Sequence, residues 1–221
     1  MKHVYLDNAA TTQVHSTVIA KMQDALANSY GNPSSTHSFG RTAKTAIESA
    51  RKTIAKYINA QPSEIIFTSG GTEADNMIIR CAVRDLGVKT IITSKIEHHA
   101  VLHTVEELEN SDTVQSLGHY NWDVKAFPID FLAAAAHKFH GPKGIGFAFI
   151  RKNSGMSCMI SGGSQERGLR AGTESFHNIV GLEEAFIHAY ENLDKEKKYV
   201  EELKSYFIEQ VKKEIPEAKF N

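Results

Sequence analysis

The chain contains few of the residues that commit a sequence to certain classes of protein. Only two of its 221 residues are cysteine, Cys81 and Cys158, and they form no CxxC pair. Without that spacing the sequence offers no structural zinc site, and so few cysteines are typical of a reducing compartment. We therefore expect a cytoplasmic protein without a metal.

Excess charge and long apolar runs are also scarce. The formal net charge is -1, from 25 basic and 26 acidic residues, and no basic cluster stands out. Such a balance gives little basis for binding nucleic acid. The start MKHVYLDNAATT lacks the apolar core of a signal peptide, and no later segment stays apolar long enough to cross a bilayer. We therefore expect neither nucleic acid nor a membrane as a partner.

The spacing of apolar residues predicts alternating helices and strands. Helical spacing occurs at 14–28, 41–58, 73–86, 99–109 and 177–215. Short apolar runs typical of buried strands occur at 64–68, 89–94, 129–136 and 146–150. This alternation predicts an α/β fold.

The segment FLAAAAHKFHGPKGIGFAFI, residues 131–150, runs an apolar strand into His137 and Lys138 and then into a glycine-rich turn. A lysine at the end of a buried strand loses hydration, which favours the neutral amine and makes it a potential nucleophile. The alternative is a lysine that keeps its ammonium in water beside glycines that merely form a turn. The segment alone leaves both interpretations open.

The turn TSGGTEADN, residues 68–76, joins a predicted strand to a predicted helix. Gly70 and Gly71 allow backbone N–H groups to converge, Thr72 adds a hydroxyl, and the positive end of the helix points at the same place. Such a combination suits a phosphate. The alternative is a tight turn before a capped helix, since neither a Walker lysine nor a GxGxxG motif is present.

Three further polar segments each have an ordinary structural interpretation. His98, in EHHAV, follows a predicted strand and opens a helix, where it could act on a ligand or simply cap the helix; a zinc pair would need a different spacing. Asp112 and Gln115, in SDTVQSLG, are common loop residues in isolation. The segment GGSQERGLRAGTES, residues 162–175, could be a functional loop that presents Thr173 or a flexible connection.

Taken in order, seven motifs closely resemble those of the cysteine desulfurases, which are pyridoxal-phosphate enzymes related to the class V aminotransferases. The motifs span nearly the whole chain and are YLDNAATT, GNPSSTHSFGR, TSGGTEADN, EHHAVL, DTVQSLG, AHKFHGPKGIG and GGSQERGLRAGTES. The resemblance implies the large domain of a pyridoxal-phosphate-dependent transferase, with a mostly parallel sheet and helices on both faces. It also implies an N-terminal arm at 1–14, a cofactor-binding domain at 15–190 and a long helix at 191–221 that leads toward a small C-terminal domain.

The resemblance assigns catalytic roles to three residues. Lys138 matches the lysine that forms the Schiff base with the cofactor. Asp112 matches the carboxylate paired with the ring nitrogen, which helps the ring to withdraw electrons. His98 matches the histidine that stacks on the ring and relays protons, and Gln115 matches the residue that hydrogen-bonds the phenolic oxygen.

The resemblance also implies how the cofactor phosphate is bound. Gly71, Thr72 and His137 match positions near the phosphate within one subunit. Thr173 matches a residue that reaches the cofactor of the partner subunit, so a homodimer is expected. Ala135 stands where the family commonly has a phosphate-binding serine, and the loss of that hydroxyl contact should weaken cofactor binding modestly.

The implied activity is the removal of sulfur from L-cysteine, which yields L-alanine and an enzyme persulfide for iron–sulfur cluster assembly or other sulfur transfer. A sulfur acceptor or iron–sulfur scaffold protein is the implied partner. Another class V enzyme, such as an aminotransferase or a selenocysteine lyase, would share Lys138 and Asp112. A non-catalytic remnant that serves as a binding module is the other alternative.

The chain departs from the family in two larger ways. The family has several dozen more residues between the segments that match EELE and DTVQ, including two strands. It also continues into a C-terminal domain that carries the persulfide cysteine and a substrate-binding arginine. We therefore expect the parent protein to be the enzyme and the chain as written to be inactive. Because only two residues separate Glu109 from Asp112, we also predict a chain break at Asn110 and Ser111.

Overall fold

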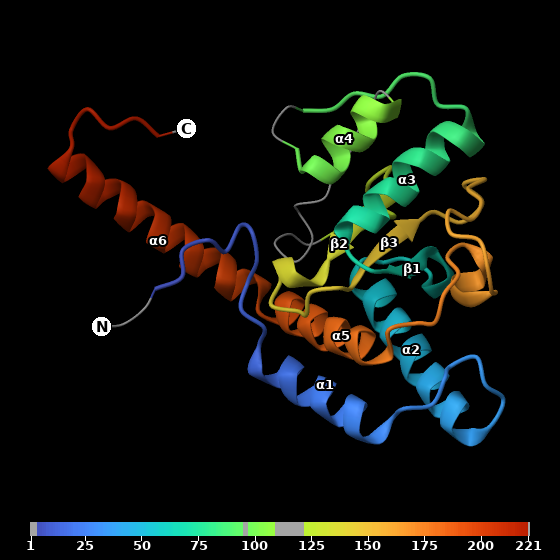
Figure 1. Ribbon diagram of the computed structural model, residues 1–221. Coiled ribbons are helices and arrows are strands. Elements are labelled where there is room, and N and C mark those ends of the chain that lie inside the picture. Colours follow the sequence, from blue (N-terminus) through green and yellow to red (C-terminus); the bar gives the residue numbers. More distant parts are fainter. Residues whose placement is uncertain (1–3, 95–96, 109–121, 221) are drawn as a thin grey trace.

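The computed structural model describes residues 4–94, 97–108 and 122–220 (Figure 1). Its helices are α1 (Ser16–Asn28), α2 (Ser38–Tyr57), α3 (Gly71–Leu86), α4 (His99–Leu108), α5 (Phe176–Glu191) and α6 (Leu193–Glu214). Its strands are β1 (Ile65–Thr68), β2 (Phe131–Ala135) and β3 (Gly146–Ile150). The predicted helices at 14–28, 41–58, 73–86 and 99–109 and three of the four predicted strands are confirmed. Within the described ranges, no helix is both long and apolar enough to span a bilayer.

The three strands form one sheet in the order β1-β3-β2, and both pairings are antiparallel. The expected mostly parallel sheet is therefore wrong for these strands. For the pair of β2 and β3 the physical reason is that residues 136–145, which join them, are too few for the crossover of about a dozen residues that a parallel neighbour requires. Since β1 and β2 each run opposite to β3, they point in the same direction and end at the same edge of the sheet.

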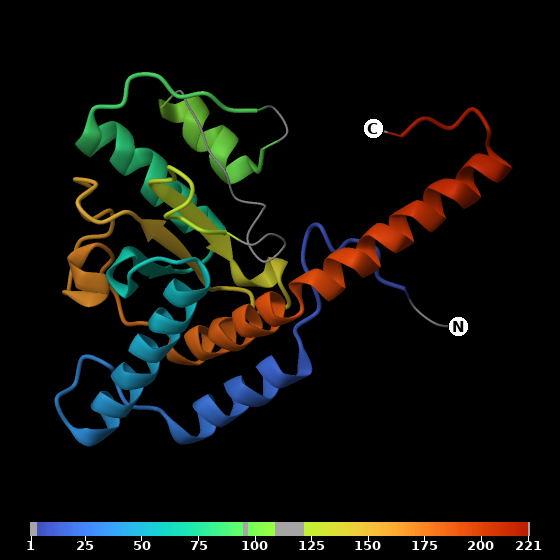
Figure 2. The ribbon, with the colours of Figure 1, turned by 180° about the vertical axis from the view of Figure 1, so that it is seen from behind.

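Helices cover both faces of the sheet, as expected, and Figures 1 and 2 show the three layers from opposite sides. Side chains alternate between the faces along each strand. Ile65 and Phe67 join a core built with α1, α2 and α5. Ile66, between them in sequence, joins a second core built with α3 and α4. Both faces of the short strands are thus buried, which explains their continuous apolar sequences.

The strand predicted at 89–94 does not form. These residues lie in an irregular segment between α3 and α4, and the side chain of Ile92 is 89% exposed. A strand requires a neighbour for its backbone N–H and C=O groups. Among the described residues the sheet contains only β1, β3 and β2, and residues 89–94 pair with none of them.

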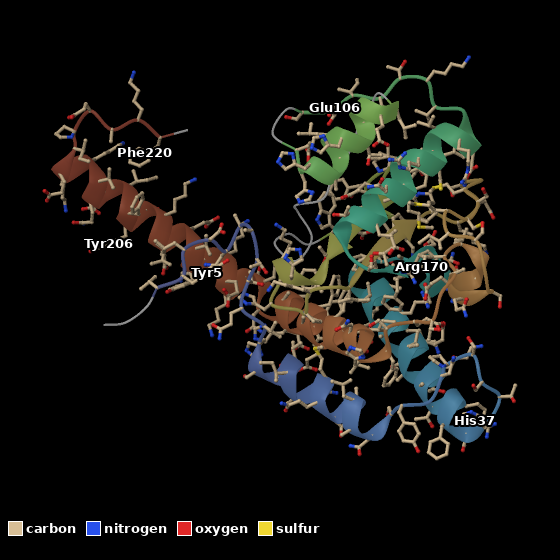
Figure 3. All side chains as sticks on the ribbon, in the orientation of Figure 1. Tyr5, His37, Glu106, Arg170, Tyr206 and Phe220 are labelled. Atoms are coloured by element: carbon tan, nitrogen blue, oxygen red, sulfur yellow. The ribbon has the colours of Figure 1, made fainter. Side chains whose placement is uncertain are left out.

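The helix predicted at 177–215 is two helices. The break lies at Asn192, whose backbone N–H and side-chain amide both donate to the carbonyl oxygen of His188, at 3.2 and 2.9 Å. Asparagine competes for backbone hydrogen bonds in this way and favours helix ends. Beyond the break, α6 projects from the rest of the molecule with no buried residue, and Figure 3 shows Tyr206 on this projecting helix.

A buried carboxyl group in α3 makes stability depend on pH. The side chain of Asp75 belongs to a residue that is 2% exposed, and its Oδ2 has no hydrogen-bond partner within the described part of the chain. Burial, together with the nearby charge of Glu97, raises the pKa of Asp75 to about 8. Between its ordinary pKa near 4 and about 8, the folded protein holds a proton that the unfolded chain releases. Stability therefore falls as the pH rises through this range.

We expect Asp75→Asn to remove most of this pH dependence. Asparagine carries no charge at either end of the range, so the loss of unfolding free energy between pH 5 and pH 8 should shrink by about 2–4 kcal/mol, given about 1.4 kcal/mol for each pKa unit. Urea unfolding at both pH values measures the change. Asp24→Asn, at an exposed carboxylate of α1 that accepts from Asn28, is the matched control and should follow the wild-type profile. Parallel profiles for wild type and Asp75→Asn would contradict the assignment.

Candidate functional site

The candidate site lies at the edge of the sheet where β1 and β2 end. Thr68, the last residue of β1, is paired with Gly146, which is paired in turn with Ala135, the last residue of β2. The glycine turn and α3 follow β1, and the short 3-10 helix η2 (Ala136–Lys138) follows β2. The turn and Lys138 therefore leave the sheet at the same edge, on either side of β3.

Gly146 allows the turn to lie directly against β3. A methyl group added at Gly146 would lie 2.2 Å from the carbonyl oxygen of Ala134 and 2.9 Å from the carbonyl carbon of Gly70. Contacts that short are excluded for real side chains, and both neighbours are backbone atoms that cannot rotate away. The glycine at the start of β3 is thus required for the close approach of the turn.

The start of α3 offers the donors that a phosphate needs. The first N–H groups of a helix have no partner within that helix, and the helix dipole places partial positive charge there. Gly71, the first residue of α3, is buried, whereas Thr72 exposes its side chain beside these N–H groups. This geometry favours the phosphate interpretation of the turn over the interpretation as a simple capped helix.

Glu73 connects this turn to the glycine-rich segment 162–175. Its carboxylate accepts from the Ser69 N–H at 2.8 Å and from Arg170 Nε and Nη2 at 2.7 and 3.0 Å. Burial alone would raise the pKa of Glu73, but the hydrogen bonds from Arg170 and Ser69 outweigh burial and hold the pKa below its ordinary value. Figure 3 labels Arg170 within this segment. The segment is therefore fixed against the turn, which argues against a flexible connection.

The structure brings Lys138, His137 and His98 together. Lys138 Nζ donates to the carbonyl oxygens of Ala9 and Ala10, at 2.6 and 3.2 Å. Burial lowers the pKa of His137 and of His98, and the charge of Lys138 lowers both further. The lowered pKa of each ring favours the neutral imidazole beside the lysine.

His98 has a second, structural contact. Its Nδ1 accepts a hydrogen bond from the Ala100 N–H, at 3.1 Å, at the start of α4. The capping interpretation of His98 is thus correct for this nitrogen. Because Nδ1 is the acceptor, the neutral ring carries its proton on Nε2, which leaves that N–H free to point elsewhere.

Thr173 lies near the start of the glycine turn. It lines a cavity of about 80 Å³ together with Ser69 and Gly144. Asp112 and Gln115, and the predicted break at Asn110 and Ser111, lie outside the described residues. The described part of the site therefore holds the predicted lysine, both predicted histidines and the phosphate turn, with Thr173 nearby.

Two features of the site were missed from the sequence. One is the set of contacts between Thr12 and the turn that carries Lys138. The other is the buried pair of Arg51 and Glu166, in which the guanidinium donates to the carboxylate at 2.7 and 2.8 Å. Arg51 lies on the buried face of α2 beside Ile47 and Ile54. An arginine within that apolar stripe is the one sequence signal of a buried partner.

The donor set suits a small molecule that carries both an aldehyde and a phosphate. An amine at a strand end can attack an aldehyde, and a helix N-terminus close to it can bind a phosphate. Pyridoxal phosphate has both groups, so the described residues fit this cofactor.

Comparison with known proteins identifies the family. The model of the aminotransferase class V family matches residues 4–113 and 110–221. The chain belongs to this family. It is 37% identical to the cysteine desulfurase IscS of Dictyoglomus turgidum over 284 residues, which covers the whole chain and 72% of that relative.

Two solved structures of the family agree with this fold. A NifS-like protein matches with a TM-score of 0.89 and 31% identity over 94% of this chain and 75% of its own. A structure described as SspA in complex with cysteine matches with a TM-score of 0.79 and 31% identity over 84% of this chain and 73% of its own. The fold is therefore that of the pyridoxal-phosphate-dependent class V enzymes.

The comparison also bears on the internal segment expected to be missing. The two matches to the family model adjoin at residues 110–113. The region aligned with the Dictyoglomus relative spans 284 residues, which is 63 more than the 221 residues of this chain. Relatives therefore carry residues that have no counterpart here, and the boundary between the two matches falls where the sequence places the gap.

Proposed function

We propose that this chain carries the cofactor-binding domain of a cysteine desulfurase, with pyridoxal phosphate attached through Lys138. The observation that carries the proposal is the position of Lys138 at the end of β2, beside His98 and His137 and at the same sheet edge as the N-terminus of α3. The kinship with proteins named cysteine desulfurase supports this activity over that of an aminotransferase or selenocysteine lyase.

Each residue of the site has a proposed task. When bound, pyridoxal phosphate supplies an electron-withdrawing ring that stabilises negative charge on a substrate carbon. The amine of Lys138 binds the aldehyde carbon, and Gly71, Thr72 and His137 hold the phosphate. His98 lies beside the lysine as a neutral imidazole, and it is proposed to stack on the cofactor ring with its Nε2–H available as a hydrogen-bond donor. Asp112 is proposed to hold the proton on the ring nitrogen, and Gln115 to bind the phenolic oxygen.

The proposed substrate is L-cysteine, and the proposed acceptor is a sulfur-carrier or iron–sulfur scaffold protein. The cysteine bound in the neighbouring SspA structure supports this substrate class. A cytoplasmic homodimer is proposed, in which Thr173 reaches the cofactor of the partner subunit; both cysteines are free thiols, in keeping with a reducing compartment. Because relatives carry a longer internal region, we expect this chain to attach the cofactor but not to turn over cysteine.

Borohydride trapping tests the proposal. The protein is mixed with pyridoxal phosphate, reduced with borohydride and digested, and the modified peptide is identified by mass spectrometry. We expect one adduct for each chain, located on Lys138. Lys143, which is exposed in the next turn, is the internal comparison and should remain unmodified at low cofactor excess. An adduct on Lys143 would overturn the assignment of Lys138, and the absence of any adduct would favour a non-catalytic remnant.

A further inference from the structure

The N-terminal segment 9–15 crosses directly over the turn that carries Lys138. Its contacts with residues 137–140 are hydrogen bonds between segments more than a hundred residues apart in sequence. Lys138 Nζ donates to the carbonyl oxygens of Ala9 and Ala10, at 2.6 and 3.2 Å. His137 Nδ1 lies 3.3 Å from Thr11 Oγ1. The segment thus forms one wall of the lysine site.

Thr12 is the central anchor of this segment. Its backbone N–H and its Oγ1 both donate to the carbonyl oxygen of His137, each at 2.9 Å. The same Oγ1 accepts from the His140 N–H at 2.7 Å. Thr12 is 7% exposed, so water does not readily replace these partners. Valine has the same shape as threonine, but its methyl group can neither donate to the His137 carbonyl nor accept from the His140 N–H.

The turn held by Thr12 has an unusual backbone. His140 has a φ of 65°, in the left-handed region that costs a residue other than glycine about 1 kcal/mol or more. Three contacts with the N-terminal segment hold His140 in this conformation. Its N–H donates to Thr12 Oγ1, and its carbonyl oxygen accepts from the His15 N–H at 3.0 Å. Its Nδ1 lies 2.8 Å from the Gln13 carbonyl oxygen. The segment and the turn therefore hold each other in place.

We propose that Thr12 is a positioning residue, which pins the Ala9 and Ala10 carbonyls over Lys138 so that they hold the lysine ammonium whenever the amine is not bonded to the cofactor. An ammonium has three N–H donors and can satisfy both carbonyls. An amine bonded to an aldehyde carbon keeps at most one N–H, so it must leave at least one carbonyl. The N-terminal segment therefore favours the unattached lysine and keeps it in the site for reattachment.

The role in the reaction rests on the proposed function, but the contacts exist in the protein without cofactor and are tested there. The cofactor-free chain is acetylated to low conversion with an N-hydroxysuccinimide ester, and the rates at Lys138 and Lys143 are compared by mass spectrometry. In Thr12→Val the acetylation rate of Lys138, divided by that of Lys143, should rise about fivefold or more. A fivefold rise corresponds to about 1 kcal/mol of lost hydrogen bonding. A chain that cannot bind pyridoxal phosphate would give the same acetylation rates. The role of Thr12 and the proposed function can therefore fail independently.

Three further variants separate positioning from general destabilisation. Thr12→Ser keeps the hydroxyl and should show the wild-type ratio of the acetylation rates of Lys138 and Lys143. Thr45→Val removes an exposed hydroxyl that donates to Arg41 within α2, and it should have no effect. Deletion of residues 1–10 removes both carbonyls while Thr12 remains, and it should raise the ratio as much as Thr12→Val does. This deletion also covers the case in which Thr12→Val does not fold.

Two results would overturn the proposal. One is an unchanged ratio of Lys138 to Lys143 in Thr12→Val or in the deletion variant. The other is an equal rise at both lysines, which indicates a loosened fold rather than a released lysine. Hydrogen exchange gives a second measurement, because backbone amides of residues 4–12 should exchange faster in Thr12→Val while those of β3 keep their wild-type rates.

Discussion

Replacement of Lys138 by alanine should abolish covalent attachment of pyridoxal phosphate to this protein. Lys138 is the lysine that follows the end of β2 and lies beside His98 and His137. Alanine offers no amine to the cofactor aldehyde, while the N–H groups at the start of α3 remain able to bind the phosphate. We therefore expect noncovalent, weaker binding. Intact mass after borohydride reduction should show one cofactor per chain for wild type and none for Lys138→Ala.

Two variants make this measurement specific. Lys143→Ala removes an exposed lysine of the following turn and should keep the full adduct. Lys138→Arg keeps the positive charge near the two histidines but cannot attach the aldehyde, so it should also lack the adduct. A stoichiometric adduct on Lys138→Ala would show that another amine is the attachment point and would end the proposed role of Lys138.

The sequence predicted the helices well because their signal is local. Apolar spacing in α1, α2, α3 and α4 records which side of each helix faces the sheet, and the structure buries those sides. The sheet was predicted less well because pairing depends on distant residues. Residues 89–94 have the composition of a strand, yet they pair with no strand of the described chain. β3 runs antiparallel to β2 because the connection between them is short.

The site shows the same division between local and distant signals. Lys138, His98 and the glycine turn each adjoin the end of an element, so their positions follow from where the strands and helices stop. Asp112 and Gln115 were assigned only by the order of the motifs, and that assignment stays a prediction. The contacts of Thr12 join residues 125 to 128 positions apart. The spacing of residues within a short stretch of sequence cannot predict a contact over so many positions.

The largest expected loss of stability comes from breaking the buried pair of Arg51 and Glu166. Each side chain is 2% exposed, and their two hydrogen bonds are 2.7 and 2.8 Å long. Glu166 also accepts from the Phe67 N–H at 2.8 Å, so it binds the sheet directly. Burial lowers the pKa of Arg51, but the contacts with Glu166 outweigh burial and raise the pKa above its ordinary value. The guanidinium therefore stays charged inside the protein.

Glu166→Ala should lower the free energy of unfolding by about 3–5 kcal/mol, because it removes the buried carboxylate that binds the guanidinium and the Phe67 N–H. The carboxylate that remains beside Arg51 is that of the partly exposed Glu48, at 3.0 Å. Glu166→Gln keeps an acceptor for Phe67 but not the charge, so its loss should be smaller. Urea unfolding at pH 7 measures both. Glu209→Ala breaks an exposed pair with Lys213 and should cost no more than about 1 kcal/mol.

The double variant Arg51→Met, Glu166→Leu decides how this loss arises. If the cost of Glu166→Ala comes from the unpaired charge, removal of the charge together with its partner should recover a large part of the lost stability. Recovery should be incomplete, because the Phe67 N–H and the Ile65 carbonyl, which now bond to the pair, lose their partners. A double variant that is less stable than Glu166→Ala would show that the pair contributes mainly through these backbone bonds. A loss below about 1 kcal/mol in Glu166→Ala would mean that water reaches the guanidinium and that the pair is not truly buried.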